Sequence, residues 1–171
     1  MPGTIRGAIW RLAVVIFLIL GIDAFWLEPS SIRAVTYSIK IDKTDKANLK
    51  GLRIAVIADL HAGAPYIDEA KIQRVVALTQ AAKPDIILLA GDYVAHVIGH
   101  HEIATETIAA NLKPLRAPLG VYAVLGNHDH WKGAPRIASA LRRAGIVYER
   151  DKGTRRIIHL CKAREKTSES S

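Results

Sequence analysis

Three short polar stretches in this sequence carry side chains that together could bind metal ions. They are Asp59-Leu60-His61, Gly91-Asp92 and Gly126-Asn127-His128-Asp129. Each follows an apolar run with the length and composition of a buried β-strand. Carboxylate, imidazole and amide groups are ligands for divalent transition metals. Because open α/β sheets bind their ligands at the carboxyl ends of the strands, the three stretches predict one site that holds two metal ions.

The candidate side chains differ in what they could do at such a site. Asp59 and His61 are separated by one residue, so both could reach one ion just after a strand ends. Asp92 has two carboxylate oxygens and could bridge two ions, while the amide oxygen of Asn127 could bind the second. His128 could face a substrate phosphate. Two cations on the order of 3.5–4 Å apart hold phosphoryl oxygens and generate a bridging hydroxide at neutral pH.

Taken one at a time, these residues also have ordinary structural explanations. An Asp after a strand is commonly a turn residue or a helix cap. Gly-Asp and Gly-Asn are common turn pairs, and a single His is commonly exposed in a loop. Such explanations would have to hold at three strand ends of one chain, so we interpret the three stretches as a metal centre.

The apolar patterns around the motifs predict alternating strands and helices. The predicted strands cover residues 52–58, 85–90, 120–125 and 146–148, and the predicted helices cover residues 68–82, 103–112 and 135–144. This order requires right-handed crossovers and a parallel sheet, so the predicted fold class is α/β. Alternating apolar residues over 34–41 predict one further, half-buried strand in the connecting segment.

The N-terminal segment 7–27 is apolar except for Arg11 and Asp23. A membrane-spanning helix needs about 20 apolar residues, and an arginine near one end can extend to the interface. Because Arg6 and Arg11 precede the apolar core, the positive-inside rule places the N-terminus in the cytoplasm and the rest of the chain outside it. We therefore expect a single span in a bacterial inner membrane.

Two alternatives to an uncleaved anchor remain open. One is a secreted protein whose signal peptide, with its apolar region at 12–22, is cleaved. The other is a buried helix of the soluble domain. The bulky residues Phe25-Trp26-Leu27 offer no small-x-small cleavage site, which favours the anchor.

Composition limits the remaining classes of function. The chain has 171 residues, 50% of them hydrophobic, and a formal net charge of +8. The apolar content suffices for a core and argues against global disorder. Basic residues are spread along the chain without interleaved aromatics, so no nucleic-acid partner is expected. The predicted organisation is an anchor or signal at 1–28, a linker at 29–51, the metal-binding domain at 52–148 and a polar tail at 149–171.

The motifs and their flanks resemble the first three motifs of the calcineurin-like metallophosphoesterases. The matching stretches are Ile-Ala-Val-Ile-Ala-Asp-Leu-His at 54–61, Leu-Leu-Ala-Gly-Asp-Tyr-Val at 88–94 and Val-Leu-Gly-Asn-His-Asp at 124–129. The resemblance covers residues 52–148 and, with the apolar leader, is closest to a membrane-associated bacterial branch. It implies the N-terminal half of a four-layer α/β/β/α sandwich. It also implies phosphomonoester or phosphodiester hydrolysis with two manganese, iron or zinc ions.

The resemblance also implies roles for individual residues. Asp59 and His61 would bind the first metal, Asp92 would bridge both, and Asn127 would bind the second. His128 would protonate the leaving oxygen or stabilise the transition state. As a neighbour outside the metal shell, residue Asp129 would orient that imidazole.

The chain departs from the family pattern after the third motif. The family continues with a Gly-His motif and a Gly-His-x-His motif, whereas His159 is the only histidine here after His130, and no Gly precedes it. We therefore expect a truncated domain with weak or no activity and one uncovered apolar sheet face. The alternatives are an inactive fragment and a membrane-tethered interaction module. A membrane location would suit a phosphate-ester substrate linked to a lipid.

Overall fold

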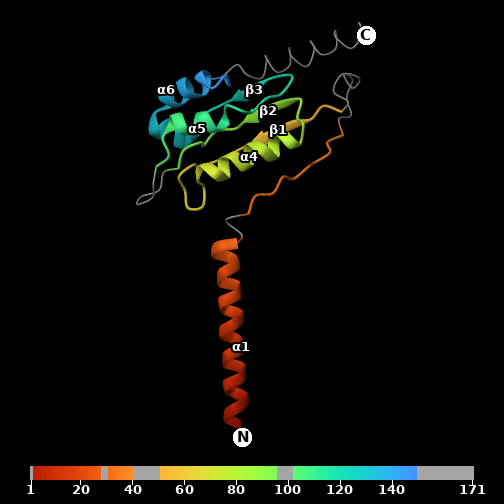
Figure 1. Ribbon diagram of the computed structural model, residues 1–171, viewed down its shortest axis with the longest axis vertical. Helices are drawn as coiled ribbons and strands as arrows, with labels where there is room; N and C mark the ends of the chain where they lie inside the picture. The colour runs from red at the N-terminus through yellow and green to blue at the C-terminus, as the bar shows by residue number, and fades with distance from the viewer. Residues whose placement is uncertain (1, 28–30, 41–50, 96–101, 150–171) are drawn as a thin grey trace. The chain divides into compact units, whose positions relative to one another are not determined.

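The structure is a computed structural model that describes residues 2–27, 31–40, 51–95 and 102–149. The chain separates into two compact units, Met1–Arg33 and Ala34–Ser171. In the first, α1 (Pro2–Ile22) is followed by a turn of π-helix, η1 (Asp23–Leu27) (Figure 1).

The helix α1 is apolar around its whole circumference. Trp10 and Phe17 are 72% and 75% exposed, and the stretch Arg6–Phe25 has a mean hydropathy of 2.2. Its length and composition are sufficient to cross a membrane. The expected N-terminal apolar helix is therefore present, while its location in a membrane stays a prediction.

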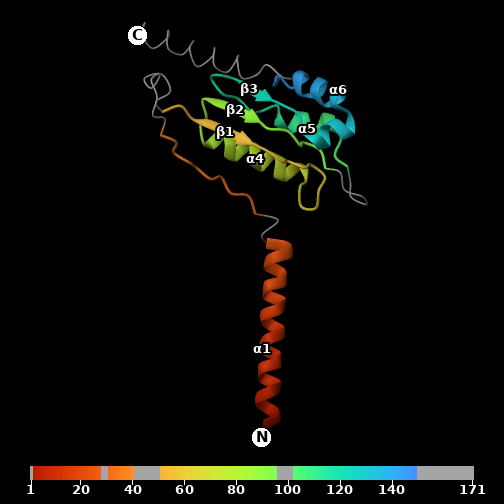
Figure 2. The ribbon, with the colours of Figure 1, turned by 180° about the vertical axis from the view of Figure 1, so that it is seen from behind.

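The second unit is built on one parallel sheet. Its strands are β1 (Ile54–Ile57), β2 (Ile86–Leu89), β3 (Val121–Ala123) and β4 (Val147–Tyr148), in the spatial order β1-β2-β3-β4. The connecting helices are α4 (Glu69–Ala81), α5 (Thr105–Leu112) and α6 (Asn127–Arg143). Right-handed crossovers between consecutive neighbouring strands place all three helices on one face of the sheet (Figures 1 and 2). The predicted α/β fold class is confirmed.

The hydrophobic core lies between the sheet and these helices. Ile87 and Leu89 of β2 are in register with Val121 and Ala123 of β3, so the four side chains line one face. The helices contribute the apolar side chains of Ile72, Val76, Ile108, Leu112, Ile137 and Leu141. Burial of these side chains fixes the strands, whose carboxyl ends carry the polar motifs.

The opposite face of the sheet is partly exposed. Ile54 and Val56 of the edge strand β1 are 53% and 63% exposed. On the neighbouring strands Ile86 and Tyr122 are buried, and the Tyr122 hydroxyl donates a hydrogen bond to the Leu119 carbonyl. Within the described residues, the expected uncovered apolar face is therefore most pronounced at β1.

Two of the predicted elements differ from the structure. Residues 31–40 form neither helix nor strand, so the strand predicted over 34–41 is wrong for its described part. Val35, Tyr37 and Ile39 alternate as in a strand but are all largely exposed. Alternation of apolar residues favours an extended chain, but a strand also needs a hydrogen-bonded neighbour.

The third helix begins at Asn127, well before the predicted start at residue 135. Its backbone is non-helical at Gly133, where φ is 113°, so the predicted helix corresponds to the part after this kink. The first part lacks apolar periodicity, and its first turn is stabilised by the Asp129 carboxylate, which accepts a hydrogen bond from the Gly126 N–H. Residues 150–171 of the tail predicted at 149–171 lie outside the described residues.

We expect an isoleucine-to-alanine substitution to lower the free energy of unfolding by different amounts on the two faces of the sheet. Ile87→Ala removes a fully buried side chain from the helix-covered face, so we expect a loss of about 2–5 kcal/mol in the free energy of unfolding. Ile54→Ala on the adjacent strand is the matched control and should cost less than about 1 kcal/mol. Urea unfolding of the full chain measures both values. Equal losses would contradict the assignment of the core to one face.

Candidate metal centre

The chain segments that follow β1 and β2 stay paired beyond the ends of the strands. The His61 N–H donates to the Asp92 carbonyl at 2.9 Å, and an isolated parallel bridge joins Ala62 to Val94. The pairing holds the first two polar motifs side by side at the carboxyl edge of the sheet. The sequence-based placement of these motifs at one edge therefore agrees with the structure.

Three of the predicted ligands have backbone conformations that L-residues rarely adopt. The φ angles of Asp59, His61 and Asp92 are 51°, 43° and 53°. Left-handed non-glycine residues cost on the order of 1–3 kcal/mol each and are concentrated at functional sites, where the surroundings enforce them. Tyr66 and Lys83 are the other non-glycine residues with positive φ among those that the structure describes. Three of the five therefore occur in the two polar segments, which supports a functional role for these segments.

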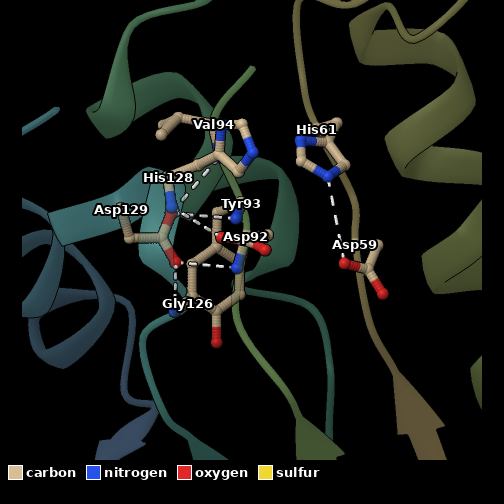
Figure 3. Close-up of polar contacts among 8 residues, drawn as sticks. All are labelled: Asp59, His61, Asp92, Tyr93, Val94, Gly126, His128 and Asp129. Atoms are coloured by element: carbon tan, nitrogen blue, oxygen red, sulfur yellow. Dashed lines mark hydrogen bonds and ion pairs between the residues drawn. The ribbon is translucent and has the colours of Figure 1, made fainter. Parts of the chain in front are cut away.

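Three ligand-capable side chains converge at this edge. The nearest ligand atoms of His61, Asp92 and His128 all lie within 4.8 Å of one another. The imidazoles of His61 and His128 lie next to each other (Figure 3). Their rings are edge to face, with a centroid distance of 4.8 Å. The Nδ1 atom of His128 is buried without a hydrogen-bond partner. A buried polar atom normally has a partner, so this donor set fits a cation or a substrate oxygen.

The other two predicted ligands are less closely placed. The Asp59 carboxylate lies 3.9 Å from Nε2 of His61, and its side chain is 69% exposed. Asn127 opens α6 and is exposed. Their assignments as metal ligands, like the separate roles of the converging residues, remain predictions. His159 and the histidines at 96, 100 and 101 lie outside the described residues.

The carboxylate of Asp129 is fully buried and binds backbone N–H groups from two segments. Its oxygens accept hydrogen bonds from the N–H groups of Asp92, Tyr93, Val94 and Gly126, at 2.8, 2.9, 3.4 and 2.9 Å. Successive N–H groups that converge on one carboxylate form an anion-binding nest. Burial raises the pKa of Asp129, while the hydrogen bonds from the N–H groups of Gly126, Tyr93, Val94 and Asp92 favour the charged form.

The same network connects Asp129 to the neighbouring residue His128, the candidate for catalysis. The Asp92 N–H donates to Asp129, and in return the His128 N–H donates to Oδ1 of Asp92 at 2.9 Å. The connection from Asp129 to His128 thus runs through the backbone and through Asp92, a metal-ligand candidate (Figure 3), while the orienting role of Asp129 stays a prediction. Both side chains at positions 92 and 129 lock the start of α6 against the loop after β2.

Two glycines permit the close approach of these segments. Gly91 has a φ of 96°, and a Cβ there would lie 2.4 Å from the Gly126 nitrogen. A Cβ on Gly126 would lie 2.2 Å from Oδ1 of Asp92. Real Cβ atoms do not approach other atoms so closely, so both motifs require glycine at these positions.

Two further residues support the site and were missed by the sequence analysis. The Tyr93 hydroxyl is buried and donates to the carbonyls of Leu89 and Val124, which ties the ends of β2 and β3 together. Burial raises the pKa of Tyr93 and keeps this donor protonated. Trp131 is 67% exposed, with its ring 5.0 Å from that of His128. If the sequence had indicated that the helix begins at Asn127, the contact could have been predicted, because residues three apart in a helix, such as His128 and Trp131, are neighbours.

The close packing at Gly126 predicts a specific loss of metal affinity. Gly126→Ala would displace the Asp92 carboxylate, so we expect the dissociation constant for Mn²⁺ to rise by about tenfold or more. Gly21→Ala is the control, because a Cβ at Gly21 meets nothing within 4 Å. Titration calorimetry on both variants measures the effect. An unchanged dissociation constant in Gly126→Ala would show that this contact does not position the metal ligand.

Comparison with curated proteins finds relatives that are named as phosphoesterases or as a pyrophosphatase. The chain is 36% identical to the UDP-2,3-diacylglucosamine pyrophosphatase LpxG of Chlamydia trachomatis, over 61% of this chain and 30% of the relative. It is 31% identical to the phosphodiesterase YaeI of Escherichia coli, over 71% and 44%. It is 28% identical to a transmembrane protein with metallophosphoesterase domain of Danio rerio, over 70% and 26%. The chain thus spans less than half of the length of each of these relatives.

The family comparison covers the whole metal centre. No solved structure matches the chain. The family model described as calcineurin-like phosphoesterase matches residues 52–166, a range that contains all three polar motifs and extends past the predicted boundary at 148. The chain therefore belongs to the calcineurin-like phosphoesterase family.

Proposed function

We propose that this protein is a metal-dependent phosphoester hydrolase that cleaves phosphomonoesters or phosphodiesters. The observation that carries the proposal is the convergence of His61, Asp92 and His128 from three separate strand ends, with ligand atoms within 4.8 Å. Family membership and the relatives named pyrophosphatase and phosphodiesterase support it. The Nδ1 atom of His128 adds support, because it is a buried polar atom without a hydrogen-bond partner and belongs to one of the three converging residues.

In this proposal the residues that follow β1, β2 and β3 would hold the cations. Asp59 and His61 bind one ion, Asp92 contributes to both, and Asn127 binds the second. Manganese, iron and zinc all suit such a set of oxygen and nitrogen ligands. Bound divalent cations would supply Lewis acidity toward the phosphoryl oxygens and a nucleophile at neutral pH.

The imidazole of His128 acts on the substrate in this proposal. It lies beside the His61 ring but comes from α6, and the backbone N–H of the same residue donates to Oδ1 of Asp92. From there it donates a proton to the leaving oxygen or stabilises negative charge on the phosphoryl group. Trp131 covers one side of the same ring and limits its freedom to rotate. The buried Asp129 fixes the helical turn that carries this histidine.

Substitution of a ligand and of the proposed acid should have different effects. Asp92→Ala removes an oxygen ligand, so we expect loss of bound Mn²⁺ and loss of hydrolysis of bis(p-nitrophenyl) phosphate. His128→Gln should keep the metal and lower kcat by about 10²–10⁴-fold, which is the usual contribution of general acid–base catalysis. Metal analysis and kinetics on the same purified samples measure both effects.

His130→Gln is the matched control, because His130 is exposed on the same helix. It should leave metal content and kcat unchanged. Loss of metal in His128→Gln would assign that residue as a ligand and overturn its role as the acid. Absence of both metal and turnover in the unsubstituted chain would overturn the hydrolase proposal and favour the interaction module, for which the exposed side chains of Ile54 and Val56 offer a surface.

We further propose that α1 anchors the protein in a bacterial inner membrane with the metal centre outside the cytoplasm. The apolar stretch Arg6–Phe25 supports the span, and Arg6 and Arg11 at its start support the orientation. The relative from Danio rerio is named as a transmembrane protein, which supports this location. LpxG is named for a substrate that carries acyl groups, which supports a lipid-linked phosphate ester as the substrate class.

The orientation can be tested with reporter fusions. Alkaline phosphatase fused after residue 149 should be active and green fluorescent protein at the same position should be dark, because the first folds outside the cytoplasm and the second inside. Replacement of Arg6 and Arg11 by Glu should weaken or invert this pattern, since positive charge sets the orientation. A fluorescent fusion in the unsubstituted chain would contradict the proposed side of the membrane.

A further inference from the structure

A cavity of about 300 Å³ lies beside the metal centre. We call it the lateral cavity. Its lining includes the residues Ala62, Val94, Glu102, Thr105, Lys132 and Arg136. The roles proposed above for the metal centre use none of these residues.

Three residues that line the lateral cavity are close in the sequence to residues of the metal centre. Ala62 directly follows His61, and Val94 lies two positions after Asp92. On α6, Lys132 lies four residues after His128, and residues four apart share one face of a helix. A phosphate at the metal centre would therefore have the lateral cavity as its nearest neighbouring space on this side.

The charge of the lining favours an anion. Lys132 and Arg136 line the cavity together with one carboxylate, that of Glu102. The side chain of Lys132 is only 28% exposed and pairs with Glu102. An ammonium group held at a cavity wall can donate a charge-assisted hydrogen bond to a phosphate oxygen.

A second acidic residue holds the guanidinium group in place from outside the cavity lining. Nε and Nη2 of Arg136 donate to the two carboxylate oxygens of Glu106 at 3.0 and 2.7 Å. The hydrogen bond from Arg136 lowers the pKa of Glu106 to about 2, so this pair stays ionised at neutral pH. A bidentate ion pair restricts the arginine side chain before any anion binds. Less side-chain conformational entropy is therefore lost when an anion binds.

We infer that the lateral cavity binds a second phosphate group of the substrate through Lys132 and Arg136. The preferred substrates are then phosphoanhydrides, or esters with a second phosphate within about one helical turn, near 5 Å, of the scissile phosphorus. This inference rests on the proposed function, because it places the scissile phosphate at the metal centre. It adds a substrate class that the three polar motifs do not specify.

Binding of inorganic pyrophosphate tests the inference without catalysis. The probe is titrated by calorimetry into the full chain, purified in detergent and stripped of metal. Lys132→Met and Arg136→Gln each remove one cation from the cavity wall, so we expect the dissociation constant to rise by about tenfold in each. Arg143→Gln is the matched control: Arg143 also lies near Glu106, at 3.9 Å, but does not line the cavity. It should change the constant by less than about twofold.

Catalysis supplies a second and independent measurement. In active protein, Lys132→Met should raise KM for a pyrophosphate diester and leave KM for p-nitrophenyl phosphate unchanged, because only the first substrate reaches the cavity. Far-ultraviolet circular dichroism confirms that each variant is folded. Pyrophosphate affinity that is the same in folded Lys132→Met, Arg136→Gln and Arg143→Gln proteins would overturn the inference.

The variant Asp59→Ala separates this inference from the proposed function. It should weaken Mn²⁺ binding and turnover but keep pyrophosphate binding in the metal-free state, since Asp59 is a largely exposed metal-ligand candidate that does not line the cavity. Lost pyrophosphate binding in folded, metal-free Asp59→Ala would place the anion at the metal centre and overturn the inference. An unsubstituted chain that binds pyrophosphate through Lys132 but shows no turnover would support the anion site while the hydrolase proposal fails.

Discussion

The metal centre depends on one buried carboxylate, that of Asp129. It is the single fully buried charged side chain among the described residues, and it accepts hydrogen bonds from four backbone N–H groups. Its absence would leave several buried donors unpaired, at about 1–3 kcal/mol each. Because these donors belong to the loop after β2 and to the start of α6, one interaction holds together two of the three segments that carry candidate ligands.

Strain and close packing in the same loops are two consequences of this constraint. Asp59, His61 and Asp92 adopt left-handed conformations that isolated residues avoid, so the surrounding hydrogen bonds must supply the compensation. Gly91 and Gly126 make the approach possible, since a Cβ on either would overlap the other segment. The result is a preorganised set of side chains, whose positions are fixed by backbone contacts before any ligand is considered.

Different parts of the structure were predictable from the sequence to different degrees. Strands such as 85–90 and the motifs at their ends could be placed, because continuous apolar runs and the carboxyl-edge rule are local and general. The start of α6 could not, since it depends on a long-range contact between Asp129 and the 92–94 backbone. In the segment 34–40 a strand was predicted where none forms. The alternation of apolar residues there carries no information about whether a neighbouring strand is available for pairing. Trp131 and Lys132 were overlooked for the same reason as the helix start.

In the two proposals, helix α6 connects the chemistry of the metal centre to the choice of substrate. His128 and Lys132 lie on its first part, which Asp129 holds in place, so the proposed acid and one cation of the proposed anion site belong to the same helical segment. Arg136 lies beyond the non-helical residue Gly133 and is held instead by Glu106 of α5. The two cations of the lateral cavity are thus fixed by different elements, one tied to the metal loops and one to the helical layer. A change in the packing of α5 against α6 could therefore alter substrate preference while the metal-binding loops stay in place.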